Sequence, residues 1–184
     1  MTTSVPRRDR VLRCVISAAD RGSTLDHDGM QRADITIAGS SARFRPGYPG
    51  IGFSPDGGMS WTLPRLVGAA RARHILLTDR VLDAAQALEL GLVAVVVPDR
   101  QLADEATQLA ARLAAGPTAA LGRIKRLLRD GESRDLDSSL DAEAIAIAAS
   151  AAGAEGREGV RAFRERRPPR FHDEPVPANG GEAG

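Results

Sequence analysis

The spacing of apolar and polar positions predicts helices most clearly in the second half of the chain. Apolar residues recur at helical spacing over Asp99 to Ala115 and over Leu136 to Ala152. Between them, Gly116-Pro117 ends the first helix, and Pro117 is expected as the first residue of another that runs to about Asp130. A last short helix is expected at residues 155–166, before Pro168-Pro169. This part of the chain is therefore predicted to be helical.

The central part of the chain alternates strand and helix patterns. Asp83 is a favourable N-cap for a helix over residues 84–90, and Gly91 stands where a left-handed cap would end it. The run LVAVVV at residues 92–97 is rich in β-branched residues, which is typical of a buried strand. Upstream, residues 33–38 alternate between apolar and polar positions and predict a second strand. The fold class expected from these patterns is α/β.

A glycine-containing loop at residues 52–58 precedes a helix expected at residues 59–67. Asp56 or Ser54 can cap the start of that helix, and the pair Gly57-Gly58 lets the backbone approach a ligand closely. The glycines match neither of the two common nucleotide phosphate-binding motifs. Near the N-terminus, residues 11–19 fit a strand or a helix, and residues 20–32 are polar and show no period.

Composition excludes several classes of partner and site. The 184 residues carry 25 basic and 24 acidic side chains, and aromatic residues make up 3%. Neither a basic field nor an aromatic stacking surface for nucleic acid is expected. A single cysteine and three scattered histidines predict no disulfide framework and no metal site. No apolar stretch approaches the roughly 20 residues of a membrane span, and no signal peptide is evident, so we expect a cytoplasmic protein with no membrane partner.

Three segments carry a family resemblance, in order and at family-like spacing. They are ADITIAGSSARFRPGYPGIGFSPDGG, WTLPRLVGAARARHILLTDRVLDAAQALELGLVAVVVP and EGREGVRAFRERRPPRF. The chain from Ala33 to Phe171 resembles the crotonase family, also called the enoyl-CoA hydratase/isomerase family. The resemblance implies part of a crotonase-like spiral of ββα turns, followed by a C-terminal helical region that forms a trimer. We therefore expect an atypical N-terminal segment at 1–32, the remaining spiral core at 33–98, helices at 99–172 and a disordered tail at 173–184.

The resemblance also implies an activity in which acyl-CoA thioesters, substrates of fatty acid metabolism, react without a further cofactor. Family members hold the thioester oxygen with two backbone N–H groups while a proton moves at the α-carbon. Asp56 resembles the acidic residue of the isomerase branch, which shuttles a proton between carbons. Tyr48, four residues after Phe44, stands where hydratases have their second glutamate. A phenol does not replace a carboxylate that activates water, so the residues favour an isomerase over a hydratase. The alternative is that Asp56 only caps the following helix.

The expected substrate-binding residues are Tyr48, Gly57, Gly58, Phe163 and Arg166. Phe163 and Arg166 match family positions that contact the adenine and phosphates of coenzyme A, often across a subunit boundary. The alternative for this pair is a packed phenylalanine and a solvated arginine. The expected partners are acyl-CoA and either further copies of the chain, as a trimer or a dimer of trimers, or a complete paralogue.

The N-terminal segment departs from the family pattern. A glycine-rich helix start, which supplies an oxyanion donor in the family, should fall near Leu25, but no glycine run stands there. Asp28 occupies the register of the first hydratase glutamate without the surrounding motif. One alternative function is therefore a catalytically inactive, truncated subunit that only assembles. Another explanation is a shifted reading frame or misplaced start, which the coding DNA would reveal.

Overall fold

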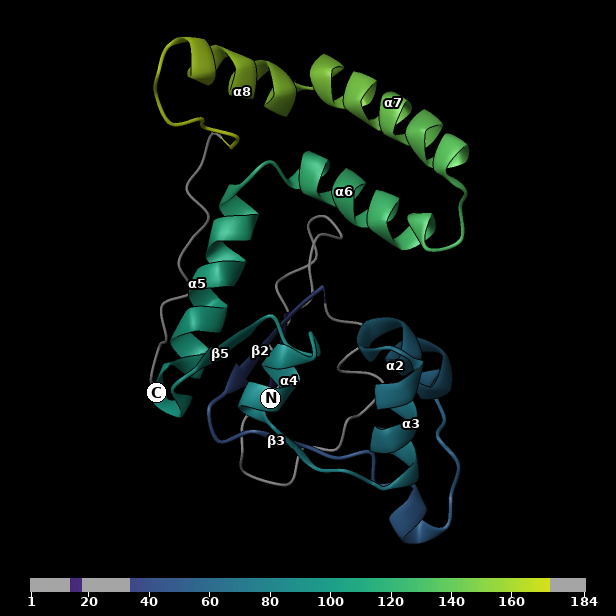
Figure 1. Ribbon diagram of the computed structural model, residues 1–184. Helices are drawn as coiled ribbons and strands as arrows, with labels where there is room; N and C mark the ends of the chain where they lie inside the picture. The colour runs from purple at the N-terminus through teal and green to yellow at the C-terminus, as the bar shows by residue number, and fades with distance from the viewer. Residues whose placement is uncertain (1–13, 18–33, 173–184) are drawn as a thin grey trace. The chain divides into compact units, whose positions relative to one another are not determined.

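The computed structural model describes residues 14–17 and 34–172 and divides the chain into two compact units (Figure 1). Of the described residues, those up to Gln108 belong to the first unit and those from Leu109 onward to the second. The boundary falls within helix α5 (Leu102–Ala115), which follows the short 3-10 helix η2 (Asp99–Gln101). Most of the expected N-terminal segment and the whole expected tail lie outside the described residues. The division expected after residue 98 stays a prediction.

A three-stranded parallel sheet lies in the first unit. Its strands are β1 (Cys14–Ser17), β2 (Ile35–Gly39) and β5 (Val95–Val97), in the order β1-β2-β5. Ile37 in the central strand pairs with Ile16 on one side and Val95 on the other, and its side chain is fully buried. The N-terminal pattern that fitted either a strand or a helix therefore forms a strand at β1.

The strand expected at residues 92–97 is shorter than predicted. The N–H groups of Leu92 and Val93 donate to the carbonyl of Ala87, so these two residues still belong to the turn that follows a helix. Residues 95–97 form the strand that pairs with β2, and the N–H of Ala94 also donates to the carbonyl of Thr36 in β2. This strand is an outer one among those described, and Val95 is exposed. Leu92 and Val93 are nevertheless buried, which explains why the whole run looks like a buried strand.

A small antiparallel ladder and a capped helix extend the first unit. Strand β3 (Arg43–Phe44) pairs with β4 (Leu82–Asp83), which leads directly into α4 (Ala84–Glu89). The Asp83 carboxylate accepts the N–H of Gln86, and the Gln86 side chain accepts the N–H of Asp83. This reciprocal capping box confirms Asp83 as the predicted N-cap. Gly91 has the left-handed conformation expected after the helix.

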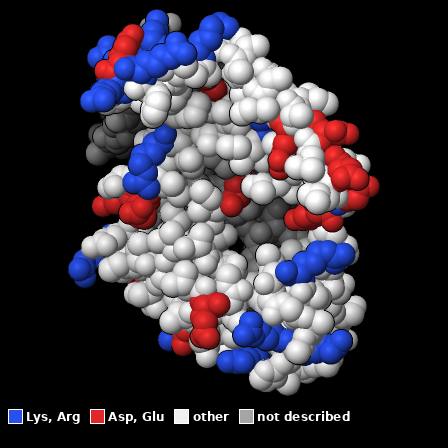
Figure 2. Space-filling model, turned by 45° about the horizontal axis from the view of Figure 1, so that its top comes forward, with Lys and Arg blue, Asp and Glu red and all other residues white. Residues whose placement is uncertain are grey.

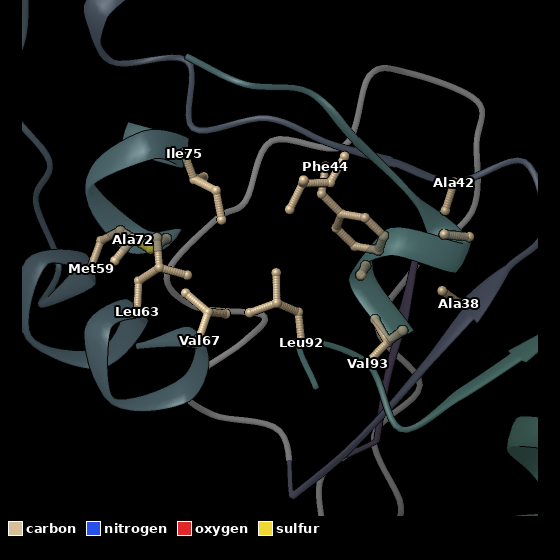
Figure 3. Packing of buried hydrophobic residues seen from close by; sticks show 13 residues of the cluster. Ala38, Ala42, Phe44, Met59, Leu63, Val67, Ala72, Ile75, Leu92 and Val93 are labelled. Atoms are coloured by element: carbon tan, nitrogen blue, oxygen red, sulfur yellow. The ribbon is translucent and has the colours of Figure 1, made fainter. Parts of the chain in front are cut away.

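The hydrophobic core of the first unit consists of buried side chains from both its helices and its strands. Helices α2 (Met59–Val67) and α3 (Ala69–Leu77) lie side by side (Figure 1), and α2 has the bounds predicted from the sequence. Leu63 of α2 and Ile75 of α3 are almost completely buried, and both point toward Phe44 and Leu92 (Figure 3). Burial of such side chains is the main favourable term that holds these elements together.

The second unit is helical, as predicted. It contains α6 (Thr118–Gly131), α7 (Leu136–Ala152) and α8 (Ala154–Arg164), with α6 beside α7 (Figure 1). Pro117 is the N-cap of α6 and not its first residue. The Glu155 carboxylate of α8 accepts the N–H groups of Ala119 and Ala120, so it satisfies open donors at the start of α6. Within the described residues, no helix has the length and apolar character needed to span a membrane.

Candidate active site

The candidate site is built on the segment that joins β3 to α2. Phe44 of β3 is buried and fixes the start of this segment in the core. The chain then makes a 3-10 turn, η1 (Pro49–Ile51), around the carbonyl of Tyr48. This carbonyl accepts the N–H of Ile51 at 3.2 Å and the N–H of Phe53 at 3.0 Å. The Tyr48 ring is half-buried and packs against the core cluster, so the turn has a fixed support.

Asp79, at the end of α3, secures the first part of this segment. Its carboxylate accepts the N–H of Gly47 at 2.7 Å and the Nε–H of Arg45 at 2.7 Å. The Arg45 hydrogen bond lowers the pKa of Asp79, the Gly47 N–H acts in the same direction, and partial burial opposes both. Asp79 therefore remains ionised at neutral pH and holds the backbone directly before Tyr48. No sequence pattern indicates this role of Asp79, because Asp79 lies far along the chain from the residues that it binds.

The structure brings Tyr48 and Asp56 into direct contact. The phenol of Tyr48 donates a hydrogen bond to Oδ1 of Asp56 across a distance of 3.0 Å. Asp56 is exposed, whereas Tyr48 is half-buried. An exposed carboxylate with one oxygen held by a neighbour can exchange a proton with a bound molecule.

The expected capping role of Asp56 is wrong. The N-cap of α2 is Gly58, and no side chain caps this helix. The main-chain carbonyl of Asp56 accepts the N–H of Met59 at 3.0 Å, but its carboxylate points to Tyr48. The carboxylate of Asp56 therefore makes no hydrogen bond to the N–H groups at the start of α2. Ser54 does not cap α2 either.

Gly57 and Gly58 turn the chain from Asp56 into α2. Both have left-handed backbone conformations, with φ of 56° and 88°, which residues with a β-carbon rarely adopt. Both glycines are exposed, and they directly follow Asp56 in the sequence. The structure thus places four of the predicted site residues on one loop, while the binding role of the two glycines stays a prediction.

Phe163 and Arg166 lie in the second unit, at the end of α8. The Phe163 ring is 85% exposed, so it is not the packed side chain of the alternative interpretation. Arg166 is also exposed and has a positive φ of 53°. Figure 2 shows that basic side chains gather over α8, whereas acidic ones gather where α6 leads into α7. Their contact with coenzyme A stays a prediction.

Other expected features of the site fall outside the described residues. The position near Leu25, where the family pattern has a glycine-rich oxyanion segment, and Asp28 both belong to residues 18–33. Among the described residues, no group of three or more His, Cys, Asp or Glu side chains could hold a metal ion.

Comparison with known proteins defines the family. The sequence profile described as Enoyl-CoA hydratase/isomerase matches residues 30–174, which is most of the chain. The chain belongs to the enoyl-CoA hydratase/isomerase family. The resemblance stated from three sequence segments is thereby confirmed, and so is the crotonase-like α/β fold, of which this chain contains a part.

Relatives of the enoyl-CoA hydratase/isomerase family include proteins with different named activities. The chain is 43% identical over 154 residues to 1,2-epoxyphenylacetyl-CoA isomerase of Escherichia coli K12, covering 84% of this chain and 57% of that protein. It is 34% identical to crotonyl-CoA hydratase of Syntrophomonas wolfei, and the match covers 75% of this chain and 53% of that protein. The crystal structure of an enoyl-CoA hydratase from Polaromonas sp. JS666 superposes with a TM-score of 0.73 at 33% identity, covering 77% of this chain and 55% of that one. The chain thus spans less than two thirds of each of these relatives.

Proposed function

We propose that the protein binds an enoyl-CoA thioester and shifts its double bond, with Asp56 as the group that moves the proton. The observation that carries this proposal is the Asp56 carboxylate, which is exposed on the site loop and is not used to cap α2. Membership of a family that acts on acyl-CoA supports the substrate class. The relative named 1,2-epoxyphenylacetyl-CoA isomerase supports an isomerisation.

The proposed reaction needs one carboxylate and no cofactor besides the thioester substrate. Asp56 takes a proton from C2 of a 3-enoyl-CoA, and the electron pair of that C–H bond forms the dienolate. The same carboxyl group then returns the proton to C4, which gives the 2-enoyl-CoA. Hydration would need a second group to activate water, and Tyr48 occupies the position that the family resemblance assigns to it. This chemistry favours a double-bond shift over addition of water.

Phe163 and Arg166 are proposed to contact the nucleotide end of coenzyme A. An exposed aromatic ring provides a surface on which adenine can stack, and the exposed guanidinium three residues further along the chain can bind phosphate oxygens. The gathering of basic side chains over α8 fits the negative charge of the coenzyme (Figure 2).

The proposed reaction is tested by proton exchange and isomerisation assays with a 3-enoyl-CoA. Asp56→Asn keeps the shape of the side chain but removes the base, so we expect the double-bond shift and deuterium uptake at C4 to disappear. Asp104→Asn, which changes an exposed carboxylate of α5, is the matched control and should keep the wild-type rate. Equal rates in wild type and Asp56→Asn would reject the role of Asp56.

A second candidate function is an assembling subunit without turnover of its own. It is favoured by large apolar side chains that lie half or more exposed on the helices of the second unit: Ile124, Leu128, Leu136, Leu140, Ile145 and Ile147. Such exposed apolar surface is typical of a protein interface. A homo-oligomer, such as the expected trimer, or a complex with a complete paralogue would cover it.

Light scattering coupled to size exclusion tests the assembly. We expect an oligomer for the wild type and a shift toward smaller species for Ile147→Asp, because a charge would be buried in the interface. Leu77→Asp changes an equally exposed apolar residue of the first unit and serves as the control. A wild-type monomer that binds no coenzyme A thioester would contradict both candidate functions.

A further inference from the structure

The hydrogen bond from Tyr48 engages only one of the two carboxylate oxygens of Asp56. The phenol donates to Oδ1 at 3.0 Å, and no residue in the described part of the chain donates to Oδ2. We propose that Tyr48 is a positioning residue, which holds the Asp56 carboxylate in one orientation and leaves Oδ2 to exchange the proton. This inference rests on the proposed isomerase function and adds to it a second residue with a different role.

Tyr48 is suited to this role because it is held more firmly than its partner. Its ring packs against the core cluster, its carbonyl accepts two N–H groups of the η1 turn, and the preceding Gly47 is bound by Asp79. Asp56 is exposed and is followed by the two left-handed glycines, so its carboxylate has little packing of its own. A rigid donor that restrains an exposed acceptor reduces the orientations that the acceptor samples, which favours the reactive one.

The hydrogen bond also changes the role expected of Tyr48. The family resemblance predicts that Tyr48 binds substrate, whereas in this structure its phenol donates a hydrogen bond to the Asp56 carboxylate. A residue that acts only by binding substrate would affect KM, whereas one that orients the base would affect kcat. These two roles can therefore be separated by kinetics.

The kinetic test uses Tyr48→Phe, which removes the hydroxyl and keeps the ring that packs against the core. We expect kcat for the 3-enoyl-CoA to fall by about 10- to 100-fold with little change in KM, the range seen when a reacting group is misplaced. Circular dichroism serves as the control that the variant is folded. A raised KM with an unchanged kcat would assign Tyr48 to substrate binding and overturn the positioning role.

A second measurement does not depend on turnover. Tyr48 is the only tyrosine in the sequence, so protein labelled with carbon-13 at the tyrosine Cζ gives one assigned signal. We expect Asp56→Asn to move this signal, because it replaces the charged acceptor, and Asp104→Asn to leave it in place. An unchanged signal in Asp56→Asn would overturn the inference, even if Tyr48→Phe is poorly folded.

The two measurements distinguish failure of the inference from failure of the proposed function. If the wild type shifts the double bond and Tyr48→Phe keeps its full kcat, the positioning role is wrong and the proposed function stands. If the wild type shifts no double bond, the proposed function is wrong, and with it a catalytic purpose for the Tyr48–Asp56 contact. A tyrosine signal that responds to Asp56→Asn would then show a hydrogen bond alone.

Discussion

Asp79 holds the main chain of Gly47, because its Oδ1 accepts the Gly47 N–H at 2.7 Å, although the two residues are 32 positions apart. The same carboxylate binds Arg45, whose guanidinium reaches Oδ2 at 2.5 Å. The end of α3 therefore fixes the segment that carries Tyr48, and Tyr48 in turn contacts Asp56. The geometry of the candidate base thus depends on a carboxylate that does not touch it.

Asp79→Asn is expected to loosen this segment without adding backbone strain. Asp79 has a positive φ of 51°, and asparagine tolerates this conformation as well as aspartate does. The segment is instead loosened because the variant lacks the negative charge that binds the Arg45 guanidinium and the Gly47 N–H. Amide hydrogen exchange should show faster exchange at Gly47 in the variant, while amides of α7 keep their wild-type rates. Unchanged protection at Gly47 would show that Asp79 does not hold this segment.

Glu158 is expected to make the stability of the second unit depend on pH. Its buried carboxylate binds Arg167 and Arg161 and accepts the N–H of Arg170, and hydrogen bonding by Arg167 is the main cause that lowers its pKa. Because the pKa is lowered in the folded state, the stabilisation is fully present above the ordinary carboxyl value of 4.5. It is lost as the pH falls further, toward the folded-state pKa.

Glu158→Gln should therefore unfold at lower urea concentration than the wild type at pH 7. The gap between the two midpoints should narrow as the pH is lowered through the acidic range, since protonation of Glu158 removes the same charge. Glu165→Gln changes a more exposed partner of Arg167 and should have a smaller effect. A gap that stays constant down to pH 2 would contradict the assignment.

The sequence predicts those elements whose ends carry their own signals. Helix α7 and helix α2 have the predicted bounds, and Asp83 is the predicted N-cap of α4, although its reciprocal bond with Gln86 was not predicted. The run at residues 92–97 was misjudged because burial of Leu92 and Val93 by a turn looks the same as burial in a strand. The local pattern of apolar residues indicates which side chains are buried. It does not indicate which carbonyl groups the N–H groups of those residues bind.

The candidate site was predictable residue by residue but not as an arrangement. Tyr48 and Asp56 were both named from the family resemblance, whereas their hydrogen bond depends on the η1 turn between them. The contribution of Asp79 could not be foreseen, because it depends on a contact between α3 and a loop that are distant in sequence. Likewise, helical spacing in α7 does not tell that Ile145 and Ile147 are exposed in the isolated chain.

Leu63→Ala is expected to destabilise the first unit strongly. Leu63 of α2 is fully buried in the core cluster, and truncation leaves a cavity that the surrounding core fills only partly. The cost for such a change is typically about 2–5 kcal/mol. Leu66→Ala in the same helix removes a side chain that is 47% exposed and should cost much less. Equal losses in urea unfolding would show that the core does not lie where the structure places it.

Two glycines of α8 should respond in opposite directions to replacement by alanine. A β-carbon at Gly156 would collide with the main-chain carbonyl of Ser150, which belongs to α7 and cannot move aside as a flexible side chain could. A β-carbon at Gly159 would meet only the Phe171 ring, at 3.9 Å. Gly159→Ala should therefore stabilise the helix by up to about 1 kcal/mol, because alanine loses less conformational entropy than glycine.

Gly156→Ala should instead destabilise the second unit by about 1–3 kcal/mol, the range for overpacked sites, because α8 must shift away from the end of α7. The change in helical circular dichroism during urea unfolding measures both variants against the wild type. A gain of stability in both variants would show that α7 and α8 are not in contact at Ser150. Destabilisation confined to Gly156→Ala would establish that this glycine is required by the close approach of the two helices and not by the helix itself.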